Sequence, residues 1–384
     1  MKTQPSIARR DFLRLAGVAA GSLCIAPTFA AVEGTSDVPR SRLDRLTTGT
    51  NVCRWFRYPK SESPEHFANY ISAAEAAYMA QIGLKHVRLC VAPRFIMDPV
   101  SGNILEKHAK QLEAAIERFH RAGLLVIIDI HVDDDHHDEL DPKWRDRFVR
   151  FWGLLAARLS RFAPEWTILE TINEPICGDR KDVWDSLNAR LAAAIRHGAP
   201  RHTILTSGIN AGGIDGLAKL SVLPDRNVIY SFHCYDPFPF THQGAGWTSP
   251  AVRPLHDVPY PSSPEAVKPL LAELQQNPDA KQLIEWYGRE RWNKEKLASR
   301  FGQAIAWGAK NRVPLYCGEF GVLPDRCKPE DRARWFHDFG QVLAENRIGW
   351  AVWGWDESFG LNREMRGGKP VVDAVVAQSL GLKP

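Results

Sequence analysis

The sequence of 384 residues lacks features that mark several protein classes. Its cysteines form no CxxC pair and no tight cluster, so neither a disulfide framework nor a zinc site is indicated. No long basic run occurs, and Lys plus Arg (49) barely exceed Asp plus Glu (45), which argues against nucleic acid or an anionic membrane as a partner. No GxGxxG follows the first apolar run, which disfavours a dinucleotide-binding fold.

The first thirty residues have the pattern of an export signal. Arg9 and Arg10 precede an apolar stretch at 15–25, and small residues lead to a cleavage point after Ala30. The arginine pair resembles a twin-arginine signal, an address for proteins that are exported already folded. The stretch is too short and too rich in Gly and Ala for a stable membrane anchor. We therefore expect a periplasmic or secreted protein, with an amphipathic N-terminal helix as the alternative.

The rest of the chain is almost neutral. Residues 1–30 carry four basic residues and one acid, which leaves 45 basic and 44 acidic residues and a net charge of +1. A nearly neutral chain suits a neutral substrate, for example a polysaccharide.

Four of the six cysteines after residue 30 lie in apolar runs, where thiols behave as small hydrophobic groups. Cys177 and Cys327 lie in expected loops, and whether they pair stays open.

Short apolar runs alternate with longer segments of helical spacing. Strands that alternate with helices indicate βαβ units and a parallel sheet, and eight units indicate a closed barrel. We therefore predict a single-domain α/β fold, a (β/α)8 TIM barrel over residues 47–384, preceded by an N-terminal extension at 31–46. The expected strands are 49–55, 86–91, 124–132, 167–175, 203–208, 228–236, 314–321 and 349–355.

One segment between expected elements is much longer than the others. Residues 237–294 follow the sixth expected strand and are rich in Pro, aromatic and polar residues. Loops of this length in compact domains are usually functional or carry small structure of their own. Because it follows a strand, this loop belongs to the carboxyl face of the barrel, where barrel enzymes have their sites. It could close one end of a substrate cleft.

Polar side chains stand at or near the carboxyl ends of the apolar strands. Their burial would cost free energy unless they were paired, so together they indicate a site. These residues are Arg88, Asp129, His131, Asn173, Glu174, His233, Tyr235, Glu319, Trp353 and Trp355.

Two of these motifs resemble the signatures of a known enzyme family. Asn173-Glu174-Pro175 and Gly318-Glu319-Phe320-Gly321 are similar to the acid/base and nucleophile motifs of glycoside hydrolase family 5, the cellulase family. The resemblance covers about residues 47–360 and implies a retaining barrel glycosidase that needs no metal or other cofactor. Further matching positions are Arg88, His131, His233, Tyr235 and Trp353.

The resemblance implies a role for each matching residue. Glu319 is expected to attack the anomeric carbon, and Glu174 to protonate the leaving oxygen and then deprotonate water. Arg88 is expected to lower the pKa of Glu319 and so keep it ionised, and Tyr235 to donate a hydrogen bond to it. Asn173 is expected to hold the 2-hydroxyl of the sugar.

Three further residues have supporting roles in this interpretation. His131 and His233 are expected to orient the substrate and the carboxylates, and Trp353 to form the floor beneath the sugar. Glu170, deeper in the barrel, is interpreted as a structural carboxylate that pairs with a cation.

The segment 131–138 is dense in His and Asp, which are possible metal ligands. A solvated polar loop is the default interpretation of such a run, and the two glutamates make a catalytic metal unnecessary. We therefore predict no metal site, and an adventitious or calcium ion is the alternative.

The family resemblance implies β-linked polysaccharides or oligosaccharides as partners, and β-1,4-glucan is the first expectation. The chain has 13 Trp, and the candidate sugar platforms are Trp55, Trp247, Trp353 and Trp355. β-Mannan, β-1,3-glucan and exo-acting β-glucosidase chemistry are alternatives within the family. A carbohydrate-binding barrel without catalysis is the alternative outside enzymes. We expect a monomer.

Overall fold

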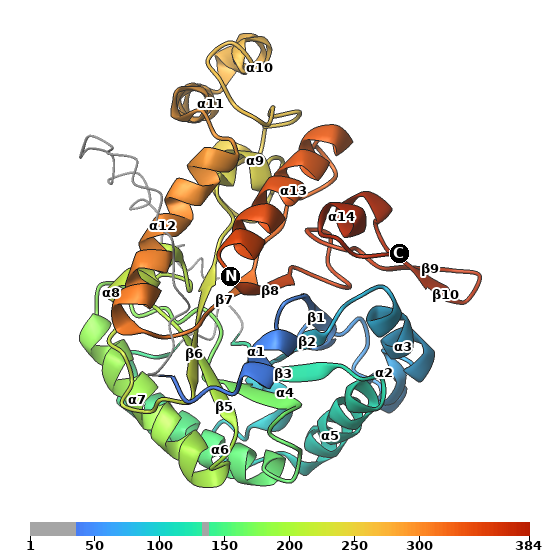
Figure 1. The fold of residues 1–384 in the computed structure, drawn as a ribbon, viewed down its shortest axis with the longest axis vertical. Helices are drawn as coiled ribbons and strands as arrows, with labels where there is room; N and C mark the ends of the chain where they lie inside the picture. The colour runs from blue at the N-terminus through green and yellow to red at the C-terminus, as the bar shows by residue number, and fades with distance from the viewer. Residues whose placement is uncertain (1–35, 133–137) are drawn as a thin grey trace, which may run out of the picture.

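A computed structural model describes residues 36–132 and 138–384 of the chain. Eight parallel strands close into a barrel in chain order, and helices surround it, as Figure 1 shows. The prediction of a single-domain (β/α)8 barrel is confirmed. The strands of the barrel are β1 Gly49–Phe56, β2 His86–Val91, β3 Leu125–Ile130, β4 Thr167–Glu170, β5 Thr203–Ser207, β6 Val228–His233, β7 Leu315–Glu319 and β8 Gly349–Val352.

Helices follow the strands because their sequences bury one face and expose the other. In α5 the residues Leu112, Ile116 and Phe119 recur at helical spacing and are fully buried. The start of α6 is fixed by Asp141, whose side chain accepts hydrogen bonds from two backbone N–H groups. The helices are α1 Arg40–Arg45, α2 Pro64–Asn69, α3 Ala73–Gln81, α4 Pro93–Ile96, α5 Glu106–Arg121, α6 Pro142–Leu159, α7 Lys181–Gly198, α8 Ile214–Lys219, α9 Phe238–Thr241, α10 Lys268–Glu273, α11 Pro278–Glu290, α12 Lys294–Asn311, α13 Pro329–Glu345 and α14 Ala374–Ser379.

None of these helices could span a bilayer: within the described ranges, no helix has both the length and the apolar composition required. The signal-like residues 1–30, and with them Cys24, lie outside the described part of the chain. An antiparallel hairpin of β9 Glu364–Arg366 and β10 Lys369–Val371 follows the barrel and was not expected from the sequence.

Residues 36–46, expected as an extension, close the amino end of the barrel. Val38 and Leu46 pack against the barrel side chains of Leu125, Ile127 and other apolar residues. Arg42 is buried beside them and donates hydrogen bonds to the Arg201 carbonyl, the Thr203 hydroxyl and the Glu165 carboxylate. This segment is therefore part of the barrel core.

The long interval 237–294 carries short helices, as its length predicted. It includes α9, α10 and α11, and the 3-10 turns η2 Pro250–Val252 and η3 Leu274–Gln276. Helix α11 contacts α9, η2, η3 and α10, so the interval forms a small helical cluster. In Figure 1, α10 and α11 lie beyond the end of α12.

Several barrel strands end earlier than the apolar runs suggested. The clearest case is β4, which was expected over 167–175 and ends at Glu170. The regular ladder ends there: the next bond to β3, from the Asn173 N–H to the Ile130 carbonyl at 3.0 Å, is displaced from the β3–β4 register, and Glu174 has a left-handed φ of 40°. The same shortening puts Tyr235, Trp353 and Trp355 in loops. Glu174 therefore stands just above the barrel rim, whereas Glu319 is the last residue of β7.

Candidate active site

Arg88 on β2 is the centre of the site and uses all of its donors. Its Nε and Nη2 bind the two oxygens of Glu170 at 2.7 and 2.8 Å. Nη2 also donates to Asn173 Oδ1 at 2.8 Å, and Nη1 donates to Glu319 Oε1 at 2.8 Å and to Asn51 Oδ1 at 3.0 Å. The planar guanidinium thereby fixes four side chains from β1, β4 and β7, or from the residues that directly follow them, in one arrangement. The interpretation of Glu170 as a carboxylate paired with a cation is confirmed.

Glu174 and Glu319 meet at one histidine. His233 Nδ1 lies 2.8 Å from Glu174 Oε1 and 3.6 Å from Glu319 Oε2. One oxygen of each glutamate and one nitrogen of His233 all lie within 4.8 Å of one another. The barrel thus brings together two carboxyls that are 145 positions apart in the sequence. Glu174 is partly exposed and Glu319 is almost fully buried, so their surroundings differ.

Tyr235 and Asn173 adjoin this pair as the sequence predicted. The Tyr235 hydroxyl donates to Glu319 Oε2 at 3.1 Å, so Glu319 is held on one oxygen by Arg88 and on the other by Tyr235. The Asn173 amide oxygen accepts from Arg88, which orients the amide so that its nitrogen is the remaining donor.

The electrostatics of Glu319 differ from the expectation. Burial raises the pKa of the Glu319 carboxyl above its ordinary value, and Glu174 adds to the rise, while His233 and Arg88 oppose it. Arg88 lowers this pKa, as expected, but desolvation of the carboxylate outweighs the attraction of the guanidinium, so the net shift is upward. Arg88 limits the rise.

Burial also decides the protonation of the two neighbours of Glu319. Burial lowers the pKa of His233, although the Glu319 carboxyl opposes the shift, so the imidazole is neutral near pH 7. A neutral ring beside carboxylate oxygens carries its proton on Nδ1, the nitrogen that faces Glu174. Burial raises the pKa of Tyr235 well above its ordinary value, so the phenol remains a hydrogen-bond donor.

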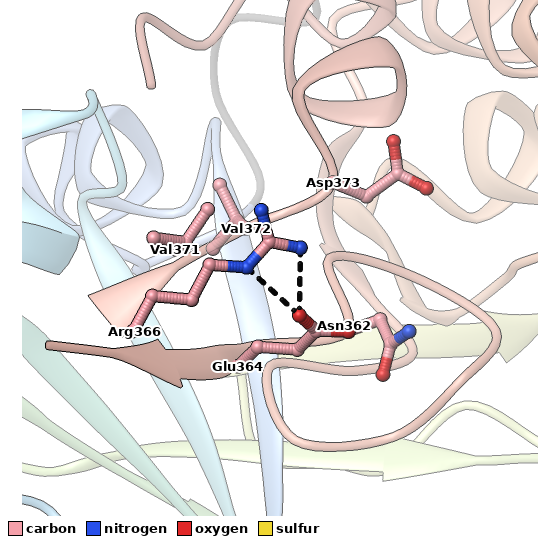
Figure 2. Close-up of a pocket in the computed structure, with 6 residues that line it drawn as sticks. All are labelled: Asn362, Glu364, Arg366, Val371, Val372 and Asp373. Atoms are coloured by element: carbon pink, nitrogen blue, oxygen red, sulfur yellow. Dashed lines mark hydrogen bonds and ion pairs between the residues drawn. The ribbon is translucent and has the colours of Figure 1, made fainter. Parts of the chain in front are cut away.

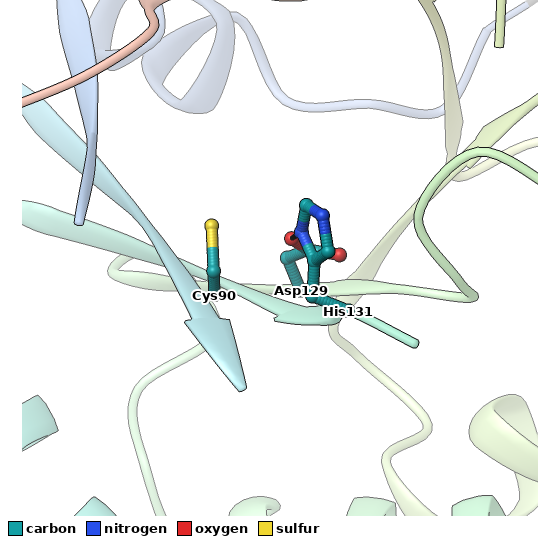
Figure 3. A group of neighbouring side chains, drawn as sticks. All are labelled: Cys90, Asp129 and His131. Carbon is teal, nitrogen blue, oxygen red and sulfur yellow. Dashed lines mark hydrogen bonds and ion pairs between the residues drawn. The ribbon is translucent and has the colours of Figure 1, made fainter. Parts of the chain in front are cut away.

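The His131 side chain contacts the buried carboxylate of Asp129. His131 Nδ1 lies 2.6 Å from Asp129 Oδ2, and the same carboxylate is 3.2 Å from Arg88 Nη2. With Cys90 these side chains make a group of potential metal ligands, and Figure 3 shows the three on the same side of the sheet. The Arg88 guanidinium lies 3.2 Å from Asp129, so its charge repels a cation at this carboxylate. The group is best explained as a hydrogen-bonded support for His131.

The sequence run proposed as an alternative metal site is described only in part. Residues 133–137 lie outside the described residues, so the possible ion there stays a hypothesis.

The six cysteines within 36–132 and 138–384 carry free thiols. Cys177 and Cys327 are both buried and do not pair.

Two of the four candidate sugar platforms are wrong. Trp55 is fully buried, its indole donates to the Phe67 carbonyl at 2.9 Å, and its ring packs against Phe119 of α5. A register shift of β1 between Val52 and Phe56 accounts for this, because such irregularities turn the residues that follow to the other face.

Trp355 is likewise fully buried, and its indole donates to Glu75 of α3 at 2.8 Å. A tryptophan that packs a helix onto the barrel has no face for a sugar.

The other two platforms remain accessible. Trp353 is partly exposed, and its ring lies 5.6 Å from that of His131, beside the site. Trp247, in the loop after β6, is 70% exposed and meets Phe359 edge to face. Both rings are therefore available to the apolar face of a sugar.

Sequence reasoning missed two contributors to the site, Asn51 and Arg57, and assigned no role to a third, Asp129. Asn51 holds Arg88, Asp129 holds His131, and Arg57 is a buried cation 5.6 Å from the Trp353 ring. Asp129 is the single polar residue of β3, Asn51 lies next to Thr50 in β1, and Arg57 directly follows β1. The strand-end rule had already found Asp129 and could have found Arg57, whereas Asn51 lies in the amino half of β1 and carries no such signal.

Comparisons with known proteins agree with this geometry. The family described as "Cellulase (glycosyl hydrolase family 5)" matches residues 47–358. Endoglucanase C of Acetivibrio thermocellus is 30% identical over 338 residues, which cover 85% of this chain and 96% of that protein. Cellodextrinase A of Ruminococcus flavefaciens is 26% identical over 312 residues, which cover 79% of this chain and 83% of that protein.

Solved structures show the same architecture. An endoglucanase from Thermotoga maritima superposes with a TM-score of 0.69 at 25% identity, and the match covers 89% of this chain and 99% of that one. The cellulose synthase subunit Z of Clostridioides difficile superposes with a TM-score of 0.68 at 20% identity, over 87% of this chain and 99% of that one, which supports the fold alone. From the family match and the identity to the Acetivibrio enzyme, the chain belongs to the cellulase family, glycosyl hydrolase family 5, and is a glycoside hydrolase.

Proposed function

We propose that the chain is an endo-acting β-1,4-glucanase that cleaves with retention of configuration, with Glu174 as acid/base and Glu319 as nucleophile. The observation that carries the proposal is the spacing of these two carboxyls, which offer oxygens within 4.8 Å of each other beside His233. Retaining glycosidases place their carboxyls about 5–5.5 Å apart, whereas inverting enzymes need about 6.5–9.5 Å to admit a water molecule between carboxyl and sugar.

The first step forms a covalent intermediate. The Glu319 carboxylate attacks the anomeric carbon, and the bond from that carbon to the leaving oxygen breaks. Glu174 gives its proton to the leaving oxygen, so the shortened glucan departs as a neutral alcohol. Tyr235 and Arg88 hold the two oxygens of Glu319 and fix which lone pair faces the sugar.

The second step releases the sugar. A water molecule takes the place of the departed chain. The Glu174 carboxylate accepts a proton from this water while the water oxygen attacks the anomeric carbon. The bond to Glu319 breaks and both glutamates return to their starting forms. Glu174 must exchange a proton in each step, and its partial exposure beside a neutral His233 suits that role.

The remaining polar groups position the sugar. Asn173 is oriented by Arg88 and is placed to donate to the 2-hydroxyl, a contact that strengthens in the transition state. His131, fixed by Asp129, is a second polar group beside the Trp353 ring. In this proposal Trp353 forms the floor beneath the sugar at the cleavage point.

The substrate proposal rests on the relatives and on exposed aromatic surface. Endoglucanase C covers nearly the same length as this chain, and Trp247 offers an exposed ring close to the site loops. We expect carboxymethylcellulose to lose viscosity much faster than reducing ends appear, which is the signature of internal cleavage. Release of glucose alone without loss of viscosity indicates exo action. Faster hydrolysis of mannan than of carboxymethylcellulose would identify a β-mannanase, and faster hydrolysis of laminarin would identify a β-1,3-glucanase.

We also propose that the enzyme is exported by the twin-arginine route and acts as a monomer. The support for export is the Arg9 and Arg10 pair ahead of the apolar stretch 15–25. Replacement of both arginines by lysine should retain the protein in the cytoplasmic fraction, and unchanged export contradicts the route. Light scattering of the mature enzyme should give the mass of one chain.

A further inference from the structure

A pocket outside the catalytic centre lies where the end of β6 meets α11 and α12. We propose that it is a second carbohydrate-binding site, which holds a neutral segment of a β-linked glucan while the catalytic cleft acts on the same polymer. The choice of ligand rests on the proposed glucanase function. The pocket is lined by Asp236, Trp286, Glu290, Trp292, Lys296, Ser299, Arg300 and Gln303.

The charged groups of the pocket neutralise one another. Lys296 Nζ lies 2.7 Å from Glu290 Oε2, and Arg300 Nε lies 2.7 Å from Asp236 Oδ2. Arg300 also binds Asp215 of α8 at 3.0 Å. An ionic ligand would compete with these pairs, whereas a neutral ligand with many hydroxyl groups can accept and donate hydrogen bonds without separating them. The pocket therefore favours an uncharged sugar over a phosphate, a carboxylate or a cation.

Two tryptophans supply apolar surface. Trp286 is partly exposed, and Trp292 is 95% buried beneath the Lys296 ammonium, which lies 5.9 Å from its ring. The Trp292 indole N–H is a buried donor that has no acceptor among the described residues. Flat aromatic faces bind the apolar faces of pyranose rings, so Trp286 is the platform in this arrangement.

Exposed polar side chains flank the tryptophans. Ser299 and Gln303 are both exposed on α12, one turn apart, and line the same pocket. The Gln303 amide oxygen accepts from Arg300 at 3.2 Å, so its nitrogen is the donor. A hydroxyl, an amide donor and an aromatic face are the groups that orient a sugar ring.

The pocket is tied to the catalytic site through the chain. Asp236 directly follows Tyr235, which donates to the nucleophile Glu319, and the Asp236 carbonyl accepts from Trp335. The platform Trp286 belongs to the helical cluster inserted at 237–294. A glucan chain held here is kept near the site loops, which raises its effective concentration at the cleft.

A second hollow on the molecule provides a comparison. It lies at the β9–β10 hairpin and has no aromatic side chain in its lining, which Figure 2 shows with its ion pair between Arg366 and Glu364. Without a flat apolar face it has no platform for a sugar. Arg366→Ala is therefore a matched control for changes in the tryptophan pocket.

The first test measures binding without turnover. In a Glu319→Gln background, the protein is incubated with insoluble cellulose, and the dissociation constant is determined from the unbound fraction. Trp286→Ala should raise this constant about tenfold, the equivalent of roughly 1.4 kcal/mol, and Arg366→Ala should leave it unchanged. Ser299→Tyr, which fills the pocket from an exposed helix position, should weaken binding without removing any packed side chain. Unchanged binding by both pocket variants overturns the proposal.

The second test separates this proposal from the function on which it rests. In the otherwise unchanged enzyme, Trp286→Ala and Ser299→Tyr should keep kcat/KM on a soluble chromogenic cellobioside within twofold of the parent and lower the rate on insoluble cellulose. An equal loss on both substrates assigns the pocket a structural role and overturns the proposal. If the parent enzyme itself does not cleave the cellobioside, the glucanase assignment fails, and the binding measurement still decides on the pocket.

Discussion

Arg88 Nη1 and Glu319 Oε1 lie 2.8 Å apart, although their residues are 231 positions apart in the chain. The same guanidinium binds Glu170 through two further nitrogens, so one buried cation supports both the nucleophile and the barrel interior. Catalytic geometry and barrel stability therefore depend on the same side chain, and a change at Arg88 should affect both.

Replacement of Arg88 tests the structural half of this relationship. Arg88→Met leaves Glu170, Asp129 and Glu319 buried without their cation, so the free energy of unfolding should fall by about 3–5 kcal/mol. Urea unfolding followed by tryptophan fluorescence measures the change. The control is Arg366→Ala, which removes an exposed ion pair and should cost less than about 1 kcal/mol. Similar losses in both variants contradict the central role of Arg88.

Tyr235→Phe tests the electrostatics of the nucleophile. Glu319 must be ionised to attack, and because burial raises its pKa, the acidic limb of kcat/KM should lie above the ordinary glutamate value of 4.5. Loss of the tyrosine hydrogen bond disfavours the carboxylate and raises this pKa further, so the acidic limb should move to higher pH. A pH profile of kcat/KM on a chromogenic cellobioside measures the limb. A shift toward lower pH would contradict the assignment.

Glu174→Ala tests proton donation. Removal of the acid should lower kcat/KM for cellulose oligosaccharides by roughly 10²–10⁴-fold, the usual contribution of general acid–base catalysis. A dinitrophenyl cellobioside has a leaving group that needs no proton, so its kcat/KM should fall far less. Equal losses on the two substrates mean that Glu174 is not the acid.

The two kinds of tryptophan give a contrasting pair of variants. Trp247→Ala removes an exposed ring, so it should leave the free energy of unfolding unchanged. It should raise KM for soluble glucan by about threefold to tenfold, because an aromatic contact contributes roughly 0.5–1.5 kcal/mol. Trp55→Ala removes a buried ring and should cost about 3–5 kcal/mol of folding free energy. Thermal unfolding and kinetics together distinguish the two. A stable Trp55→Ala variant with raised KM reverses the interpretation of that residue.

The sequence allowed the barrel and the polar centre to be predicted because each rests on a local pattern. Alternating apolar runs and helical segments indicated eight βα units, and polar residues at the strand ends, such as Arg88 and Glu319, indicated a common rim. The closed barrel then fixed which of these residues meet. The family resemblance supplied the roles, which the pattern alone does not contain.

Other features depend on geometry that the sequence pattern does not record. The direction of Trp55 follows from a register shift within β1, and the end of β4 at Glu170 coincides with a change of register that the Asn173 to Ile130 backbone hydrogen bond marks. The raised pKa of Glu319 reflects a balance between burial and charge, and the degree of burial is known only once the barrel is closed. Only the structure shows the pocket formed by Trp286 and α12.

The most direct test of the central claim is to identify the residue that becomes bonded to the sugar. A 2-deoxy-2-fluoro-cellobioside with a dinitrophenyl leaving group slows the second step, so the glycosyl-enzyme should accumulate and be found by mass spectrometry of the digested protein. We predict a single adduct on the peptide that contains Glu319, together with release of the β-anomer from unmodified oligosaccharide in NMR. An adduct on Glu174, or release of the α-anomer without any adduct, contradicts the proposed roles of the two glutamates.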